Sequence, residues 1–202
     1  TLPQAIRDVL NFALTLEYLE EEFYTMGLAA SGLIPAGPRP VFVQIQKHEA
    51  AHVDLLAATL GANAVAKPTF DFTAGGAFAD VFTNYTTFLA LAQGFEDTGV
   101  RAYKGQAGAL ITDNAILTTA LQIHSVEARH ASKVRRLRAQ KGWITGNTVD
   151  VTALAAIYAG EETTTQAGAN TATVVSTNAS TQAFDEPLTI AQVLAIVDPF
   201  IV

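Results

Sequence analysis

Two short motifs in this sequence carry side chains that bind metal ions in proteins. Glu49 and His52 stand three residues apart, and Glu127 and His130 repeat the same Glu-x-x-His spacing. On a helix, residues three apart share one face and lie about one turn apart, so the Glu and the His can grip one ion. Each motif is therefore a candidate half of a metal site.

Two further motifs place a tyrosine seven residues after a glutamate. Glu17 precedes Tyr24, and Glu96 precedes Tyr103. Two helical turns put each pair on one stripe of its helix. We interpret the tyrosines as core residues whose phenols hydrogen-bond to nearby carboxylates and orient them, with a redox role as the alternative.

The four motifs repeat in register along the chain. Both Glu-x6-Tyr residues recur after 79 positions, and both Glu-x-x-His residues recur after 78. Residues 3–61 and 77–141 therefore read as duplicated helix pairs. Two divalent cations about 3.5–4 Å apart need bridging carboxylates, terminal carboxylates and a nitrogen donor each. The predicted metal ligands are Glu17, Glu49, His52, Glu96, Glu127 and His130.

These ligands suit iron or manganese, and zinc can also bind them. The alternative is a bundle in which the same carboxylates and histidines pair with one another without metal. Burying four carboxylates in that way costs several kcal/mol for each unpaired charge, so metal binding is favoured. The predicted cofactors are two divalent ions.

Other acids and histidines lie near the motifs. The run Glu20–Glu22 is expected on a solvated face, although Glu20 or Glu21 could reach the site. His48 points about 100° away from Glu49 and is expected on the surface or in packing. His124 shares the face of Glu127. We expect it to lie outside the site, and the alternative is a role as an accessory ligand or as a support for one.

Glu161 and Glu162 follow a fifth predicted element, residues 149–159, which could form a short helix or strand. We expect this acidic pair to lie away from the site. The alternative is that it supplies an accessory ligand or caps the metals.

Apolar residues spaced at about 3.6 positions predict four long helices, over residues 3–30, 41–60, 77–106 and 113–141. About 15 residues join the second helix to the third, enough for a crossover along a bundle. We therefore predict an all-α four-helix bundle over residues 1–142. Residues 143–202 are predicted as an extension that packs on it, with ordered coil over the bundle at 163–184 and a short helix at 189–197.

Composition narrows the class of protein. Half of the 202 residues are hydrophobic and 15% are charged, which excludes general disorder. No apolar run approaches the roughly 20 residues of a membrane span. The net charge of −7 disfavours a nucleic-acid partner. Cysteine is absent, so any metal must be held by carboxylate and imidazole.

The duplicated motifs resemble those of the ferritin-like superfamily of di-iron carboxylate bundles, which includes rubrerythrins, ferritins and manganese catalases. Three stretches are also similar to extracytoplasmic ferritin-like proteins related to plant desiccation-related proteins: NFALTLEYLE at 11–20, YAGEE at 158–162 and FDEPLT at 184–189. The resemblance implies the ferritin-like bundle and the same six metal ligands.

The resemblance leaves the reaction open. We expect redox chemistry on peroxide or dioxygen, of ferroxidase, peroxidase or manganese-catalase type, in stress protection. A non-enzymatic metal-binding or structural envelope protein is the alternative. The chain begins at Thr1 without Met, and its tail is rich in Thr, Ala and Asn, so we expect an extracytoplasmic location after removal of a signal peptide. Homo-oligomerisation stays open.

Overall fold

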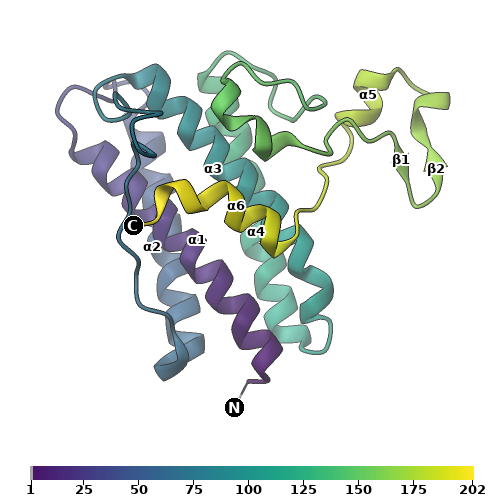
Figure 1. The fold of residues 1–202 in the computed structure, drawn as a ribbon, viewed down its shortest axis with the longest axis horizontal. Helices are drawn as coiled ribbons and strands as arrows, with labels where there is room; N and C mark the ends of the chain where they lie inside the picture. Colours follow the sequence, from purple (N-terminus) through teal and green to yellow (C-terminus); the bar gives the residue numbers. More distant parts are fainter. Residues whose placement is uncertain (1) are drawn as a thin grey trace.

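Four long helices dominate the computed structural model, which describes residues 2–202 (Figure 1). They are α1 (Gln4–Ala29), α2 (Arg39–Leu60), α3 (Tyr85–Gln106) and α4 (Asn114–Leu137). α1 packs mainly on α2, and α3 packs mainly on α4, while α1 and α3 join the two pairs. The prediction of an all-α bundle built from two helix pairs is confirmed.

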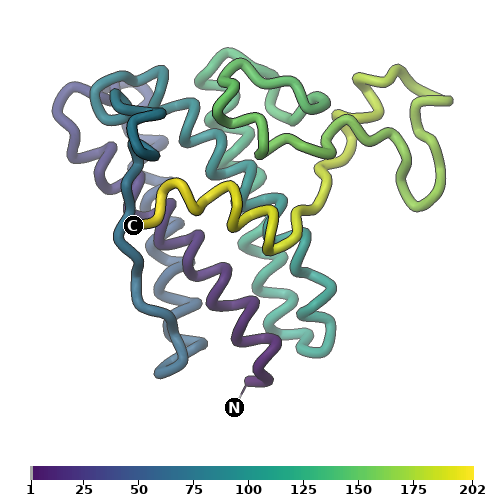
Figure 2. The backbone as a smooth tube through the Cα atoms, viewed as in Figure 1, coloured from purple at the N-terminus to yellow at the C-terminus, as the bar shows by residue number. Residues whose placement is uncertain are grey.

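A long crossover connects the two helix pairs. Figure 2 shows residues 61–84 running along the bundle from the end of α2 back to the start of α3. The crossover follows α1, because Asn11 donates its side-chain amide to the carbonyl of Asn63 at 3.0 Å and accepts from the amide of Val65 at 2.9 Å. The expected crossover is therefore present.

Helices α3 and α4 begin at residues that cap them. Asn84 accepts a hydrogen bond from the amide of Thr86, and Asp113 accepts from the amides of Ala115 and Ile116. Such caps satisfy amides that have no partner within the helix. The predicted start of the third helix at residue 77 is wrong, since residues 77–84 form turns.

The fourth helix ends four residues earlier than predicted. Its last residue is Leu137, and Ala139 adopts a positive φ of 57°. A left-handed residue cannot continue a right-handed helix, so the chain leaves the bundle before Lys141.

The C-terminal part contains short elements. They are η3 (Thr152–Tyr158), β1 (Thr165–Gln166), β2 (Ala169–Asn170), η4 (Thr171–Thr173), α5 (Thr177–Thr181), α6 (Ile190–Val197) and η5 (Asp198–Phe200), with η1 (Gly61–Asn63) and η2 (Ala107–Leu110) earlier in the chain. The predicted helix at 189–197 is confirmed. The expectation that 163–184 covers the bundle as coil is wrong, because it forms a hairpin and a helix beside the bundle (Figure 1).

The last residues bind the crossover. The amide of Asp71 donates to the carbonyl of Phe200 at 2.9 Å, and the amide of Val202 donates to the carbonyl of Thr69 at 3.0 Å. α6 also lies against α3. The C-terminal segment is thus fixed to the crossover and to α3.

Two apolar clusters fill the bundle, one toward each end. Phe23, Phe42 and Phe88 belong to one, and Leu14 and Leu56 belong to the other. The positions between Leu14 and Phe23 on α1 include buried glutamates. Polar side chains at that level are therefore held between apolar layers. Among residues 2–202, no helix is both long and apolar enough to cross a membrane.

Candidate metal centre

The structure brings the six predicted ligands together in the middle of the bundle. They form two overlapping groups in which potential ligand atoms lie within 4.8 Å of one another. The first group is Glu17, Glu49, His52 and Glu127. The second group is Glu49, Glu96, Glu127 and His130. The four glutamates have no solvent-exposed surface.

In the first group, the carboxylates surround one nitrogen of His52. Its Nδ1 lies 3.0 Å from Glu49 Oε2, 3.1 Å from Glu17 Oε2 and 3.1 Å from Glu127 Oε1. These oxygens come from three helices, α1, α2 and α4. The group therefore depends on the assembled bundle rather than on the Glu-x-x-His motif alone.

The second group repeats this arrangement around His130. Its Nδ1 lies 2.8 Å from Glu49 Oε1, 3.3 Å from Glu96 Oε2 and 3.6 Å from Glu127 Oε2. Glu49 and Glu127 belong to both groups and direct different oxygens to each histidine. Such carboxylates could be shared by two ions, whereas Glu17 and Glu96 belong to one group each.

The donor atoms fit a pair of divalent ions. Within residues 2–202, Glu49 Oε1, Glu96 Oε2, both oxygens of Glu127 and Nδ1 of His130 are buried without hydrogen-bond partners. Several of them approach one another closely, but not in hydrogen-bonding geometry. Buried polar atoms left unpaired are costly, and oxygen and imidazole donors suit iron, manganese or zinc. Bound ions would give these atoms partners.

The tyrosines contact the carboxylates of the opposite half. Tyr24 on α1 donates its hydroxyl to Glu96 Oε1 on α3 at 2.5 Å, and Tyr103 on α3 donates to Glu17 Oε1 on α1. Both phenols are buried. Each tyrosine thus orients a carboxylate across the bundle, rather than the one on its own stripe.

Burial sets the electrostatics of the glutamates. It raises the pKa of Glu17 to about 8, with repulsion from Glu127 adding to the effect. Burial also raises the pKa of Glu96 well above its ordinary value. For Glu127, burial alone would raise the pKa, but the close approach of protonated His130 and His52 outweighs burial and lowers the pKa to about 2. The carboxylates therefore differ in proton affinity despite equal burial.

The histidines hold protons strongly in the metal-free protein. Burial alone would lower the pKa of His52, but the adjacent carboxylates of Glu127, Glu17 and Glu49 outweigh burial and raise the pKa to about 12. The pKa of His130 is also raised, because attraction to Glu96 and to its other carboxylate neighbours outweighs burial. Two imidazolium ions thus partly neutralise the acidic cluster, and metal ions would have to replace their protons.

Glu20 is a buried acid that the preferred sequence interpretation placed on a solvated face. It is 3% exposed, and its Oε1 has no hydrogen-bond partner in the described chain. Burial and repulsion from Glu127 raise its pKa well above the ordinary value. Its position three residues after Glu17 was the available signal. The interpretation holds for Glu21 and Glu22, which are partly exposed and pair with Lys67 at 3.0 and 2.8 Å.

His48 and His124 lie outside the two ligand groups among the described residues. His48 is partly exposed, as expected, but its Nδ1 lies 2.8 Å from Nε2 of His130, and the two rings stack with centroids 5.1 Å apart. It therefore supports His130 from the outer side. The spacing of His48 from Glu49 gives no signal of this contact, because it crosses from α2 to α4.

Glu161 lies outside the two ligand groups among the described residues. It is buried and forms an ion pair with Arg101, whose Nε lies 2.8 Å from Glu161 Oε1. The same oxygen accepts from the amide of Glu186 at 2.9 Å. Glu162 accepts from the amide of Gly160 at 3.1 Å. Glu161 thus belongs to the junction between the bundle and the C-terminal extension, whereas the bond of Glu162 lies within the extension.

The fold and these groups define a class: a helical bundle with carboxylates and imidazoles buried between two helix pairs. The sequence model of the ferritin-like domain family matches residues 6–140. The chain belongs to the ferritin-like domain family. The comparison with curated proteins gave no match.

Proposed function

We propose that the six clustered residues hold a dinuclear metal centre that carries out redox chemistry on peroxide or dioxygen. The observation that supports this most directly is the overlap of the two ligand groups in Glu49 and Glu127. Two shared carboxylates, two terminal carboxylates and two histidines match the ligand requirements of a pair of divalent ions.

Each residue has a role in this proposal. Glu49 and Glu127 would hold both ions, Glu17 and His52 would bind one of them, and Glu96 and His130 would bind the other. A pair of iron or manganese ions would supply electrons to, or accept them from, the small oxygen substrate. Tyr24 and Tyr103 hold the terminal carboxylates by hydrogen bonds. The surrounding apolar clusters keep bulk water from the carboxylates.

Disproportionation of peroxide needs no external reductant, whereas peroxidase activity does. The chain has no cysteine, so a reductant for peroxidase activity would come from another molecule. A non-enzymatic metal-binding role is the competing function. A cap over the metals by residues 163–184 would favour that role, but this segment lies beside the bundle (Figure 1). Its placement therefore gives the non-enzymatic role no support.

The stretches at 11–20, 158–162 and 184–189 support a closer relationship to the extracytoplasmic, desiccation-related group. We include that assignment, a role in stress protection and an extracytoplasmic location in the proposal. Detection of the endogenous protein outside the cytoplasm by cell fractionation would support the location, and detection in the cytosolic fraction would contradict it.

Metal analysis of the purified protein tests the proposal. We expect two ions per chain after reconstitution with Fe(II) or Mn(II), and loss of both ions in Glu49→Ala and in Glu127→Ala, since each residue serves both positions. Asp54→Ala is the matched control, because Asp54 is an exposed acid on α2. That variant should retain two ions.

Turnover is measured on the same samples by oxidation of Fe(II) and by loss of hydrogen peroxide. Acceleration in the wild type and in Asp54→Ala, but not in the two bridging variants, is the expected result. Two bound ions, marked thermal stabilisation and no turnover would instead establish the non-enzymatic role. Absence of metal binding would refute both functions.

A further inference from the structure

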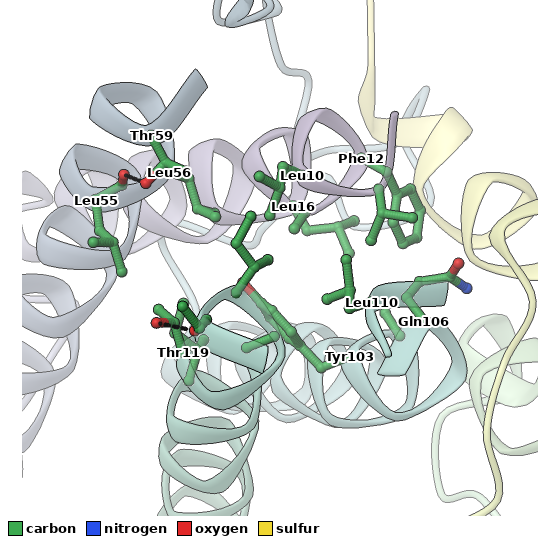
Figure 3. Close-up of a pocket in the computed structure, with 17 residues that line it drawn as sticks. Leu10, Phe12, Leu16, Leu55, Leu56, Thr59, Tyr103, Gln106, Leu110 and Thr119 are labelled. Carbon is green, nitrogen blue, oxygen red and sulfur yellow. Dashed lines mark hydrogen bonds between the residues drawn. The ribbon is translucent and has the colours of Figure 1, made fainter. Parts of the chain in front are cut away.

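An apolar cavity of about 150 Å³ lies in the same end of the bundle as the second apolar cluster (Figure 3). All four long helices and η2 contribute to its wall. Figure 3 shows Leu10 and Leu16 on one side of it and Tyr103 on the other. The cavity is distinct from the two ligand groups, none of whose residues lines it.

The lining defines the chemistry of a ligand. Most lining residues are aliphatic or aromatic, and the polar ones are uncharged: Thr59, Tyr103, Gln106 and Thr119. None of the described residues in this wall carries an ionisable acid or base other than the phenol of Tyr103. A charged ligand would lose its hydration without gaining a partner, so the cavity selects an uncharged, apolar molecule.

The volume defines the size of a ligand. An apolar cavity of about 150 Å³ is large enough to bind benzene or xenon. A helix or an extended peptide, with a diameter of about 10 Å for a helix, does not fit in such a volume. Leu55, one of the lining residues, is 42% exposed, so the wall reaches the protein surface and leaves a route for entry.

Tyr103 connects the cavity with the candidate metal centre. The residue lines the cavity and donates its hydroxyl to Glu17, one of the proposed terminal ligands. A molecule in the cavity would therefore contact the tyrosine that orients this carboxylate. The side chain of Tyr103 thus links the cavity wall to the candidate metal centre.

We propose that this cavity is a binding site for a small, uncharged apolar molecule of about one aromatic ring in size, placed against Tyr103. The site is separate from the proposed chemistry on peroxide or dioxygen. Binding at it requires neither bound metal nor turnover, so its test is independent of the proposed function.

Benzene is the probe, and thermal unfolding is the first readout. A ligand that binds only the folded state raises the unfolding temperature as its concentration exceeds its dissociation constant. We expect benzene to raise the unfolding temperature of the wild type. Ala120→Leu should abolish the shift, since Ala120 lines the cavity and three added carbons fill part of it. Ala51→Leu, an exposed change on α2, should retain the shift.

A second measurement covers the case in which Ala120→Leu fails to fold. Crystals of the wild type under xenon pressure should show xenon among Leu10, Leu56 and Ile123. Absence of xenon there, no benzene shift in the wild type, or an equal shift in folded Ala120→Leu would each overturn the proposal. A dimer in sedimentation that covers Leu55 and excludes benzene would also overturn it, in favour of a second copy as the occupant.

Discussion

Tyr24 donates its hydrogen bond to Glu96 on a different helix, although Glu17 precedes it by two turns on its own helix. Tyr103 mirrors this arrangement by donating to Glu17. Each helix pair thus orients a carboxylate that belongs to the other pair. The duplicated halves are therefore coupled through the ligands themselves as well as through apolar packing.

Tyr24→Phe and Tyr103→Phe should each weaken metal binding without unfolding the protein. Loss of a hydrogen bond that orients a ligand commonly lowers metal affinity by about 10- to 100-fold. Because the contacts are mirrored, the two variants should have similar effects. Affinity is measured by competition with a chromogenic chelator.

Tyr85→Phe is the matched control for these variants. The hydroxyl of Tyr85 is buried without a hydrogen-bond partner in the described part of the chain. Its removal should leave metal affinity unchanged. Wild-type affinity in both Tyr24→Phe and Tyr103→Phe would contradict a role of these phenols in orienting the ligands.

The six residues that cluster at the candidate site could be predicted from the sequence because helical spacing places each Glu and His on one face. The repeat of 78 or 79 residues then relates the two halves. The partner of each tyrosine could not be found in this way, because periodicity describes one helix and the contact joins two. The position of Glu20 on α1 is compatible with a place on the surface or near the site. The packing of α3 against α1 buries it, and the sequence of α1 alone does not show that packing.

The remaining differences have similar causes. The turns at 77–84 contain apolar residues such as Phe78 and Val81, which are buried without being helical. The apolar residues of this segment therefore indicate that it is buried in the core, and they do not indicate a helix. Residues 163–184 lack charge, but their threonines and asparagines find hydrogen bonds within short local elements, as in the cap of η4 by Asn170. A low charge alone does not determine what a segment packs against.

Metal affinity should increase with pH. In the metal-free protein the pKa of His52 is raised from 6.5 to about 12, so its imidazole is protonated near neutral pH. Metal binding requires the neutral ring and releases that proton. Apparent affinity should therefore increase about tenfold per pH unit for each histidine that loses a proton. Proton release into weakly buffered solution, measured during metal titration, checks this expectation.

The stability of the metal-free protein should have the opposite pH dependence. A pKa raised by folding stabilises the native state fully below the unfolded value of 6.5 for His52, and this contribution is lost as pH rises toward about 12. The raised pKa of Glu17, about 8, acts in the same direction. Urea unfolding at about pH 6 and about pH 9 should show a lower free energy of unfolding at the higher pH. A flat profile would contradict protonated histidines in the cluster.

Arg101 should be essential for attaching the C-terminal extension. Its side chain is 1% exposed, pairs with Glu161, and donates to the carbonyls of Ala159 and Glu186 at 2.8 and 2.7 Å. Arg101→Met would leave the Glu161 carboxylate buried without its charge partner, at a cost of about 3–5 kcal/mol. Chemical unfolding measures the loss.

Lys104→Met provides the control for Arg101→Met on the same helix. Lys104 is about one-third exposed and pairs with Asp185 at 3.9 Å. Exposed pairs of this kind contribute about 0–1 kcal/mol, so this variant should be close to the wild type. Equal losses of unfolding free energy in the two variants would show that burial of the Arg101–Glu161 pair does not increase its contribution to stability.

Gly105→Ala should destabilise the fold, although alanine usually favours a helix. A Cβ at this position of α3 would lie 1.9 Å from the carbonyl oxygen of Leu188, whose amide donates to the carbonyl of Arg101 at 3.1 Å. The backbone leading into α6 would have to move away, and we expect a loss of about 1–3 kcal/mol, as for other overpacked sites.

At Gly108 in η2, an added Cβ meets no atom of the described chain within 4 Å, and φ is not positive. Gly108→Ala should therefore be neutral or stabilising by up to about 1 kcal/mol. Denaturant unfolding of the two variants gives opposite signs if the close approach of α3 to residue 188 holds the C-terminal segment in place. A stabilised Gly105→Ala protein would show that this segment moves away without cost.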